Sequence, residues 1–431
     1  MKRLSYPILL ISMLFATLLG ACGPEPAPNG SAQDGGPSAQ PGASPSAAFV
    51  AVSPTAGPTE LATESIEIVT ARTPVPTPDL AASTQTELDQ VALANPRPLQ
   101  LPEELGQAPL GLITWSPDSK HFLADAFSDE SIWVGQAGYS LTDLYLGDVT
   151  SDKVSLVLHN AGWPAWSRDG HTIYYLAIRS SDQDVQYDLY RRSLADEESQ
   201  LVFTDVGDPG TQPAVSETAD GRLVSLNRDY QTVLIDQGTI TLIASLVNLP
   251  TTSITGENFS LAPDGATLAV LSQSHPIYIV DLAKPALVAT VDAAVPFFNN
   301  VAWSGDSSQL AYATPEGLFV YDLPTRSARS VVTRNDLGLP SGDPTVSFGL
   351  PIWSPDEQTI LFAASTQDWT RTSKLSRNAA YQFASTANGD HWKALSETLL
   401  NLAPNKAQAI TPQREPETGR ELPFLIDLTW K

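Results

Sequence analysis

Cysteine and basic residues are the scarce components of this 431-residue sequence. Cys22 is the single cysteine, so no intramolecular disulfide can form and no second thiol is present as a metal ligand or nucleophile. The 24 Lys and Arg residues stand against 48 Asp and Glu residues, which gives a formal net charge of −24. Nucleic-acid binding requires a basic footprint that releases counterions, and anionic lipid headgroups attract basic segments. The composition therefore argues against nucleic acid as a partner and against direct docking on anionic lipid.

The apolar stretch near the N-terminus is too short for a membrane-spanning helix. It runs from Pro7 to Leu19, whereas a helix needs roughly 20 residues to cross the hydrocarbon core. Lys2 and Arg3 precede this stretch, and the small residues Gly20 and Ala21 follow it. A basic start, an apolar middle and a small-residue end are typical of a secretory signal peptide. We therefore expect this segment to direct export and then to be removed.

The end of this segment, Leu19-Gly20-Ala21-Cys22, resembles the lipobox of bacterial lipoproteins. The resemblance implies a signal peptide over residues 1–21, cleavage before Cys22 and a lipid on the Cys22 sulfur. The lipid would anchor the chain in the cell membrane, facing the extracytoplasmic side, at the cell surface or in the periplasm. The alternative is an ordinary signal peptide that happens to contain a cysteine.

Residues 22–95 are rich in Pro, Ala, Ser, Thr and Gly and show little apolar periodicity. Such a segment cannot bury enough apolar surface to offset the entropy of ordering, so the sequence predicts a disordered tether. Ile66 to Val69 is a short apolar exception, but Pro-Thr repeats such as Thr73 to Pro78 argue against a domain here. We expect the folded domain to span residues 96–431.

A repeat with a period of 40 to 50 residues fills the remainder of the chain, as in stacked or radial architectures. Seven positions of the repeat align, with spacings between 42 and 51 residues: Trp115, Trp166, Val215, Leu261, Trp303, Trp353 and Leu402. Four copies keep a Trp-Ser pair followed by Asp: Ile113 to Asp118, Pro164 to Gly170, Val301 to Asp306 and Pro351 to Asp356. The copies at Val215 and Leu261 are divergent, and the copy at Leu402 is incomplete.

A complete copy contains four short β-rich runs, which is the composition of one propeller blade. The Ser-Pro-Asp-Gly-like tetrads are suited to tight turns between the first two strands. The repeated Trp-Ser-Pro-Asp unit resembles the WD-like repeats of the TolB family, which also occur in the propellers of prolyl oligopeptidase-type peptidases. The resemblance covers residues 97–431 and implies an all-β, seven-bladed β-propeller, with six blades as the alternative. It implies no particular activity, because propellers host unrelated functions.

The two ends of the repeat region predict how the ring closes. The chain stops at Lys431 after the third strand of the last copy, so this blade lacks a fourth strand. Arg97 to Leu101 lies at the right distance before the first Trp-Ser pair to supply it. A closure of this kind pairs both ends of the domain in one sheet and covers two exposed edges.

The residues needed for common catalytic chemistry are mostly missing. No Gly-x-Ser-x-Gly nucleophile elbow is present, the five histidines lack the spacing of a zinc site, and we predict no metal or other cofactor. Asp281, Asp322 and Asp427 occupy equivalent strand positions, where we expect them to bond backbone groups. Acidic residues in loops, including Asp205 and Asp208, are better candidates for a site, although solvated loop charge is the ordinary explanation.

Loops on the face opposite the Trp-Ser-Pro-Asp turns are the predicted binding surface, because aromatic side chains on a rigid scaffold are common recognition anchors. The candidate residues come from four loops: Asp129, Glu130, Trp133, Trp163, Phe297, Phe298, Trp369 and Arg371. We expect a monomeric module without enzymatic activity that binds a protein, peptide or envelope polymer such as a glycan. The alternative is a secreted enzyme or carbohydrate-binding protein whose acidic residues converge in the central funnel.

Overall fold

The computed structural model describes the greater part of the repeat region. The described residues are 92–106, 108–134, 137–180, 185–196, 198–207, 213–249, 258–272, 275–295, 300–337, 347–366, 379–389, 392–396, 400–414 and 421–430. They all belong to one compact unit, Thr63–Lys431. The predicted signal peptide, the lipidation site Cys22 and most of the predicted tether lie outside the described residues.

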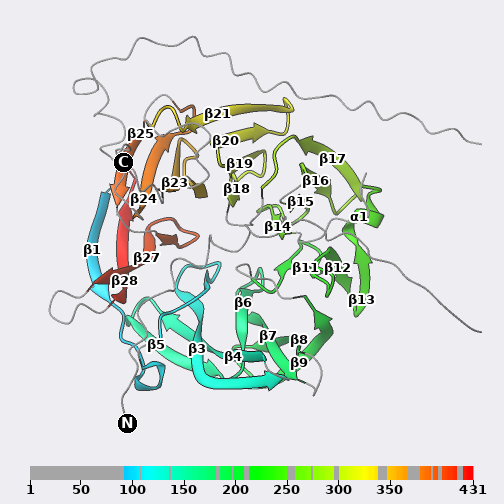
Figure 1. Ribbon diagram of the computed structural model, residues 1–431, viewed down its shortest axis with the longest axis vertical. Helices are drawn as coiled ribbons and strands as arrows, with labels where there is room; N and C mark the ends of the chain where they lie inside the picture. The colour runs from blue at the N-terminus through cyan, green and yellow to red at the C-terminus, as the bar shows by residue number, and fades with distance from the viewer. Residues whose placement is uncertain are drawn as a thin grey trace, which may run out of the picture. The chain divides into compact units, whose positions relative to one another are not determined.

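The described strands form seven antiparallel sheets of four strands each, arranged as the blades of a β-propeller (Figure 1). This confirms the predicted all-β, seven-bladed fold and excludes the six-bladed alternative. Blade 1 contains β2 (Ile113–Trp115), β3 (His121–Val134), β4 (Ala137–Asp148) and β5 (Lys153–Leu158). Blade 2 contains β6 (Gly162–Trp166), β7 (Thr172–Ser180), β8 (Val185–Ser193) and β9 (Ser199–Val206). Blade 3 contains β10 (Ser216–Glu217), β11 (Leu223–Leu226), β12 (Thr232–Asp236) and β13 (Thr239–Leu242).

The remaining four blades follow in chain order. Blade 4 contains β14 (Asn258–Leu261), β15 (Thr267–Leu271), β16 (Ile277–Asp281) and β17 (Ala286–Val291). Blade 5 contains β18 (Val301–Trp303), β19 (Gln309–Thr314), β20 (Gly317–Asp322) and β21 (Ser327–Thr333). Blade 6 contains β22 (Ser347–Trp353), β23 (Thr359–Thr366), β24 (Ala379–Thr386) and β25 (Trp392–Ser396). Blade 7 contains β26 (Asn401–Leu402), β27 (Gln408–Arg414), β28 (Glu421–Thr429) and β1 (Ala92–Pro98). The short 3-10 helix η2 (Glu103–Leu105) and the helix α1 (Ile243–Leu246) lie between strands.

Blade 7 joins the two ends of the described chain, as the sequence predicts. Strand β1 pairs antiparallel with β28, from Ala92 opposite Thr429 to Pro98 opposite Phe424. The closing strand therefore begins five residues earlier than the predicted Arg97. Arg97 adds ion pairs to Asp152 of blade 1 at 3.2 Å and to Asp427 of blade 7 at 3.8 Å. The closing strand thus also links its own blade to the next one.

The turn between the first two strands has the same construction in several blades. In blade 1, the Ser116 hydroxyl donates to Asp118 Oδ1 at 2.7 Å and accepts the backbone N–H of His121 at 3.0 Å. The Ser-Asp bond recurs in blades 2, 5 and 6 at 2.6 to 2.7 Å. The residue after the Asp, or after Asn405 in blade 7, has a positive φ in all seven turns: Ser119, Gly170, Gly221, Gly265, Ser307, Glu357 and Lys406. The repeated Asp-Gly signal thus reflects a left-handed position that glycine adopts without steric cost.

The divergent third copy is aligned differently from our expectation. Thr218 takes the place of the serine, because its hydroxyl donates to Asp220 Oδ1 at 2.6 Å. Glu217, not Val215, is therefore the counterpart of the blade tryptophans. The sequence alignment was two residues off because Val215 is apolar, like the other aligned positions, and it is indeed buried. Glu217 was overlooked because it is acidic at a position that is Trp in four copies. Its carboxylate accepts the backbone N–H of Arg168 in blade 2 at 2.8 Å.

The four tryptophans of the repeat connect neighbouring blades, as predicted. Trp353 Nε1 donates to the backbone carbonyl of Ala302 in the preceding blade at 3.0 Å, and the Trp303 and Trp166 indoles make the same bond to their preceding blades. Trp115 donates to the Asn401 side chain of blade 7 at 2.8 Å, across the point of closure. The side chains of Trp115, Trp303 and Trp353 are buried in the hydrophobic clusters between blades. These residues therefore have a structural role.

A candidate binding face on blades 1 to 3

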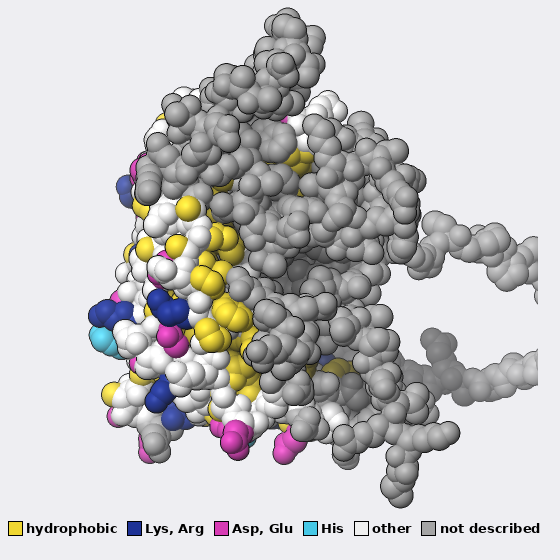
Figure 2. All heavy atoms as spheres, turned by 90° about the vertical axis from the view of Figure 1, so that its left-hand side faces the viewer, with side chains coloured by type: hydrophobic (Ala, Val, Ile, Leu, Met, Phe, Trp, Pro, Cys, Tyr) yellow, Lys and Arg dark blue, Asp and Glu magenta, His cyan; other side chains and the backbone are white. Residues whose placement is uncertain are grey.

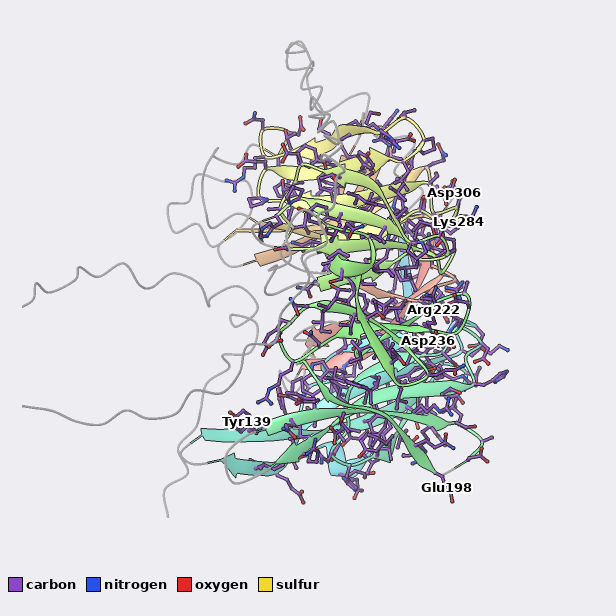
Figure 3. All side chains as sticks on the ribbon, turned by 90° about the vertical axis from the view of Figure 1, so that its right-hand side faces the viewer. Tyr139, Glu198, Arg222, Asp236, Lys284 and Asp306 are labelled. Atoms are coloured by element: carbon purple, nitrogen blue, oxygen red, sulfur yellow. The ribbon has the colours of Figure 1, made fainter. Side chains whose placement is uncertain are left out.

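The ring has two different faces. The turn face carries the Ser-Asp turns and the connections from third to fourth strands, including Asp306, Lys284 and Asp236 (Figure 3). The hairpin face carries the connections from second to third strands, and Tyr139 lies on that opposite side in Figure 3. On the turn face, hydrogen bonds from Arg222 and Thr218 lower the pKa of Asp220 to about 2. Hydrogen bonds from Thr150 lower that of Asp148 to about 2. These carboxylates are committed to turn architecture.

The strands that build the hairpin face differ in length around the ring. In blades 3 and 4 the second and third strands have only four or five residues. In blade 1 they have 14 and 12 residues, and in blade 2 they have nine each. Blades 1 and 2 therefore project beyond the hairpin face next to a lower sector formed by blades 3 and 4.

The view from the side of β1 shows scattered basic and acidic side chains instead of a continuous patch of one sign (Figure 2).

The segment Ser128 to Tyr139, which we expected to be a loop, is an extended β-hairpin. Strands β3 and β4 pair as far as Val134 opposite Ala137. Between Phe127 and Ser131 the register shifts, because three residues of β3 oppose one residue of β4. An irregularity of this kind bends the strand and redirects the chain beyond it. Glu130 is exposed at this bend, whereas the side chains of Asp129 and Trp133 lie outside the described part of the structure.

Three large aromatic residues are exposed on this face. Phe127 on β3 is 52% exposed, Tyr139 on β4 is 37% exposed, and Tyr230 in the connection between β11 and β12 is 46% exposed. Tyr230 also has a φ of 56°, a left-handed conformation that is uncommon for a bulky residue. This conformation belongs to the tight turn in which the Tyr230 N–H donates to the Asn227 carbonyl at 2.9 Å. Blades 1 and 3 thus both present aromatic surface to solvent.

Trp163, a predicted ligand contact, is instead partly packed into the domain. Its ring makes an edge contact with Tyr187 of β8, with centroids 5.1 Å apart, and it borders the hydrophobic cluster of blades 2 and 3. Trp163 therefore lies on strand β6 and not in a loop, and its role as a ligand contact stays a prediction. The side chain is partly exposed.

Asp125 fixes the backbone beside Trp163. Its carboxylate accepts the backbone N–H of Leu112 at 2.8 Å and that of Trp163 at 3.0 Å. The neighbouring chain approaches so closely that a Cβ on Gly111 would lie 2.4 Å from Asp125 Oδ1. Burial raises the pKa of Asp125, against the effect of the two N–H donors. Through these two bonds Asp125 links blade 1 to blade 2. It lies directly beneath the hairpin face, because the exposed Phe127 is two residues farther along β3 and has its side chain on the same side of the strand.

A polar cluster lies between blades 2 and 3. Arg179 donates to both carboxylate oxygens of Asp188, at 2.7 and 3.2 Å. The buried Asp188 also accepts the backbone N–H of Asp205 at 3.2 Å. The Asp205 side chain, a candidate from the sequence, forms an ion pair with Arg228 at 3.7 Å. The cluster orders the connection between these blades and leaves its arginine and aspartate charges largely paired.

Several candidate residues cannot be placed in this arrangement. Phe297, Phe298, Trp369, Arg371 and Asp208 lie outside the described residues. Sequence reasoning did not single out Phe127, Tyr230 or Asp125. An aspartate within the apolar run Phe122 to Ala126 is the signal that would have marked Asp125, because a strand that is buried on both faces rarely carries a charge.

Acidic residues do not gather into a metal site in the part of the chain that the structure describes, where no suitable group of three or more His, Cys, Asp and Glu residues occurs. Asp281 accepts the backbone N–H groups of Ala283 and Lys284, and Asp322 accepts that of Thr325, as expected for blade architecture. No helix among the described residues has the length and apolarity to cross a membrane.

The fold and this face define the chain as a seven-bladed β-propeller in which blade 1 has the longest of the described hairpins. No protein-family model matches the sequence, and a search of curated proteins also finds no match.

Proposed function

We propose that the chain is a membrane-anchored extracytoplasmic lipoprotein whose propeller binds a protein, peptide or envelope polymer at the hairpin face. The observation that carries this proposal is the exposure of Phe127, Tyr139 and Tyr230 on a rigid scaffold. Aromatic side chains bury a large area at a small entropic cost, and they are enriched among the residues that dominate binding energy. We also assign the repeats to the TolB type, on the basis of the Trp-Ser-Pro-Asp units.

The path of β1 supports an orientation for this module. Asp427 pairs with Gln408, which directly follows the turn at 403–407, so this end of β28 lies at the turn face. Ala94 pairs with Asp427, and Ala92 lies two residues farther in the same direction. The preceding chain therefore joins the propeller at the turn face. A tether attached there leaves the hairpin face clear of the attachment point and accessible to partners.

The anchoring part of the proposal predicts the location of a Cys22→Ser variant. Without the Cys22 thiol no thioether to a lipid can form, so we expect the protein to leave the detergent-soluble membrane fraction. Fractionation followed by mass spectrometry of the N-terminus measures both location and processing. Recovery of correctly cleaved Cys22→Ser protein in the membrane fraction would contradict lipid anchoring.

The binding part predicts the effect of a Tyr139→Ala and Tyr230→Ala double variant. Removal of two anchor rings should weaken the capture of envelope proteins or glycans by about tenfold or more, with little change in melting temperature because both rings are exposed. Quantitative capture from envelope extracts and a glycan array provide the measurement. The matched control is Leu194→Ala with Leu201→Ala, which removes two side chains of similar exposure, 42% and 54%, from blade 2. Equal losses in both variants would disprove a specific role of the hairpin face.

A further inference from the structure

The end of the blade 1 hairpin is a two-stranded ribbon that pairs with no further strand of the described residues. We define the ribbon as Ser131–Val134 of β3 with Ala137–Ser140 of β4. Strand β2 pairs with β3 only as far as Ala124, and β5 pairs with β4 only as far as Leu144. No third strand among the described residues pairs with the ribbon. Its outer backbone groups therefore have the geometry of a sheet edge, which is a template for another strand.

One edge of the ribbon can be assigned to particular residues. The carbonyl of Thr142 accepts the backbone N–H of Ala161, on the side of β4 that faces away from β3. Backbone groups alternate in direction along a strand with a period of two residues. The N–H and C=O groups of Ser140 and Gly138 therefore point to the same free side. An extended chain placed there would continue the sheet beyond the end of β5.

The charge of the hairpin indicates which kind of chain fits. Directly before the ribbon the sequence carries two adjacent acidic residues, Asp129 and Glu130, and no Lys or Arg occurs from Phe122 to Asp152. Glu130 is exposed at the base of the ribbon. A second copy of this chain would place another acidic ribbon beside the first, and like charges on adjacent strands repel. A strand that carries Lys or Arg matches both the backbone edge and the charge.

We propose that the ribbon binds an extended, cationic peptide segment of a partner protein by β-strand addition along the edge that contains Gly138 and Ser140. Backbone hydrogen bonds provide the register, Tyr139 offers apolar contact, and the acidic side chains select for basic residues. This inference deepens the proposed binding function, because it assigns a substrate class to one part of the hairpin face.

The probe for this proposal is a capped hexapeptide of alternating Lys and Val, titrated into the full chain in detergent. Fluorescence anisotropy measures the affinity of this peptide. The charge control is a peptide of the same length in which Glu replaces each Lys. A third peptide has the Lys-Val sequence with N-methylated backbone amides and therefore cannot donate along an edge. We expect the Lys-Val peptide to bind at least tenfold more tightly than either control peptide. Equal affinity of the N-methylated peptide would overturn strand addition.

Two protein variants locate the site. Ser140→Pro removes an outward N–H, a change that an edge strand tolerates, and should weaken peptide binding by at least fivefold. Asp129→Asn with Glu130→Gln should weaken it by about two- to fivefold per charge at low salt, as for exposed charge pairs. Asp196→Asn with Glu198→Gln, at the turn between β8 and β9, is the matched charge control and should have no effect.

The melting temperature of each variant establishes that the ring is intact. A variant with Asp129→Asn and Glu130→Gln alone tests the proposal if Ser140→Pro unfolds. If the Lys-Val peptide fails to bind while envelope capture still depends on Tyr139 and Tyr230, strand addition is wrong and the binding function stands. If the ribbon variants cause the protein to dimerise less instead, its occupant is a second copy and the proposal is overturned.

Discussion

A chain from which residues 1–98 are removed should unfold at a temperature on the order of 10 °C below that of the intact protein. Strand β1 (Ala92–Pro98) is the fourth strand of blade 7 and pairs along β28. Its loss exposes the edge of β28 and removes the ion pairs of Arg97 with Asp152 and Asp427. The free energy of unfolding of a domain is only about 5–15 kcal/mol. The loss of a closing strand should therefore lower it by a large fraction. Differential scanning calorimetry measures the shift.

The matched control removes residues 1–91 and retains β1. It should melt within a few degrees of the intact protein, because all contacts of blade 7 described above remain. Identical melting temperatures for the two shortened chains would show that β1 contributes nothing to closure. A shift in both would instead assign the stability to residues before Ala92. The comparison therefore isolates the contribution of seven residues.

Much of this architecture could be predicted from local sequence signals, because most blades repeat the same turn between their first two strands. The Ser-Asp bond and the left-handed residue after it need only four adjacent residues, so the turn can be predicted from a short motif. The missing fourth strand of the last copy was predictable because an unpaired edge requires a partner. Glu217 was not predictable by the same means, because the blade keeps the hydroxyl-aspartate bond through Thr218 and Asp220 while the tryptophan is absent.

The candidate site was less predictable from the sequence than the fold. Spacing predicted a connection between the second and third runs of blade 1, but whether it forms a loop or continues as paired strands depends on cross-strand contacts between distant residues. Phe127, which is exposed, directly precedes a register shift that no local motif in the sequence marks. Tyr230 lies in a short turn without an apolar pattern, so nothing in the sequence marks its ring as exposed.

Replacement of Trp353 by Ala should destabilise the domain by about 3–5 kcal/mol, the usual cost when a buried Trp or Phe is truncated to Ala. Trp353 is 1% exposed and packs between blades 5 and 6 with Phe348 and Phe362. The change leaves a cavity and also removes the hydrogen bond to the carbonyl of Ala302. Urea unfolding, followed by tryptophan fluorescence and circular dichroism, measures the difference in the free energy of unfolding.

Trp353→Phe separates these two contributions, because phenylalanine fills most of the space but has no N–H donor. A net hydrogen bond contributes about 0.5–1.5 kcal/mol, so this variant should lose clearly less stability than Trp353→Ala. Trp166→Ala is the comparison at an equivalent position whose ring is only partly buried, and its cost should lie below that of Trp353→Ala. If all three variants lost the same stability, burial would not set the contribution of these residues. The indole hydrogen bond between blades would then be the dominant interaction, and the packing explanation of the repeated tryptophan would be wrong.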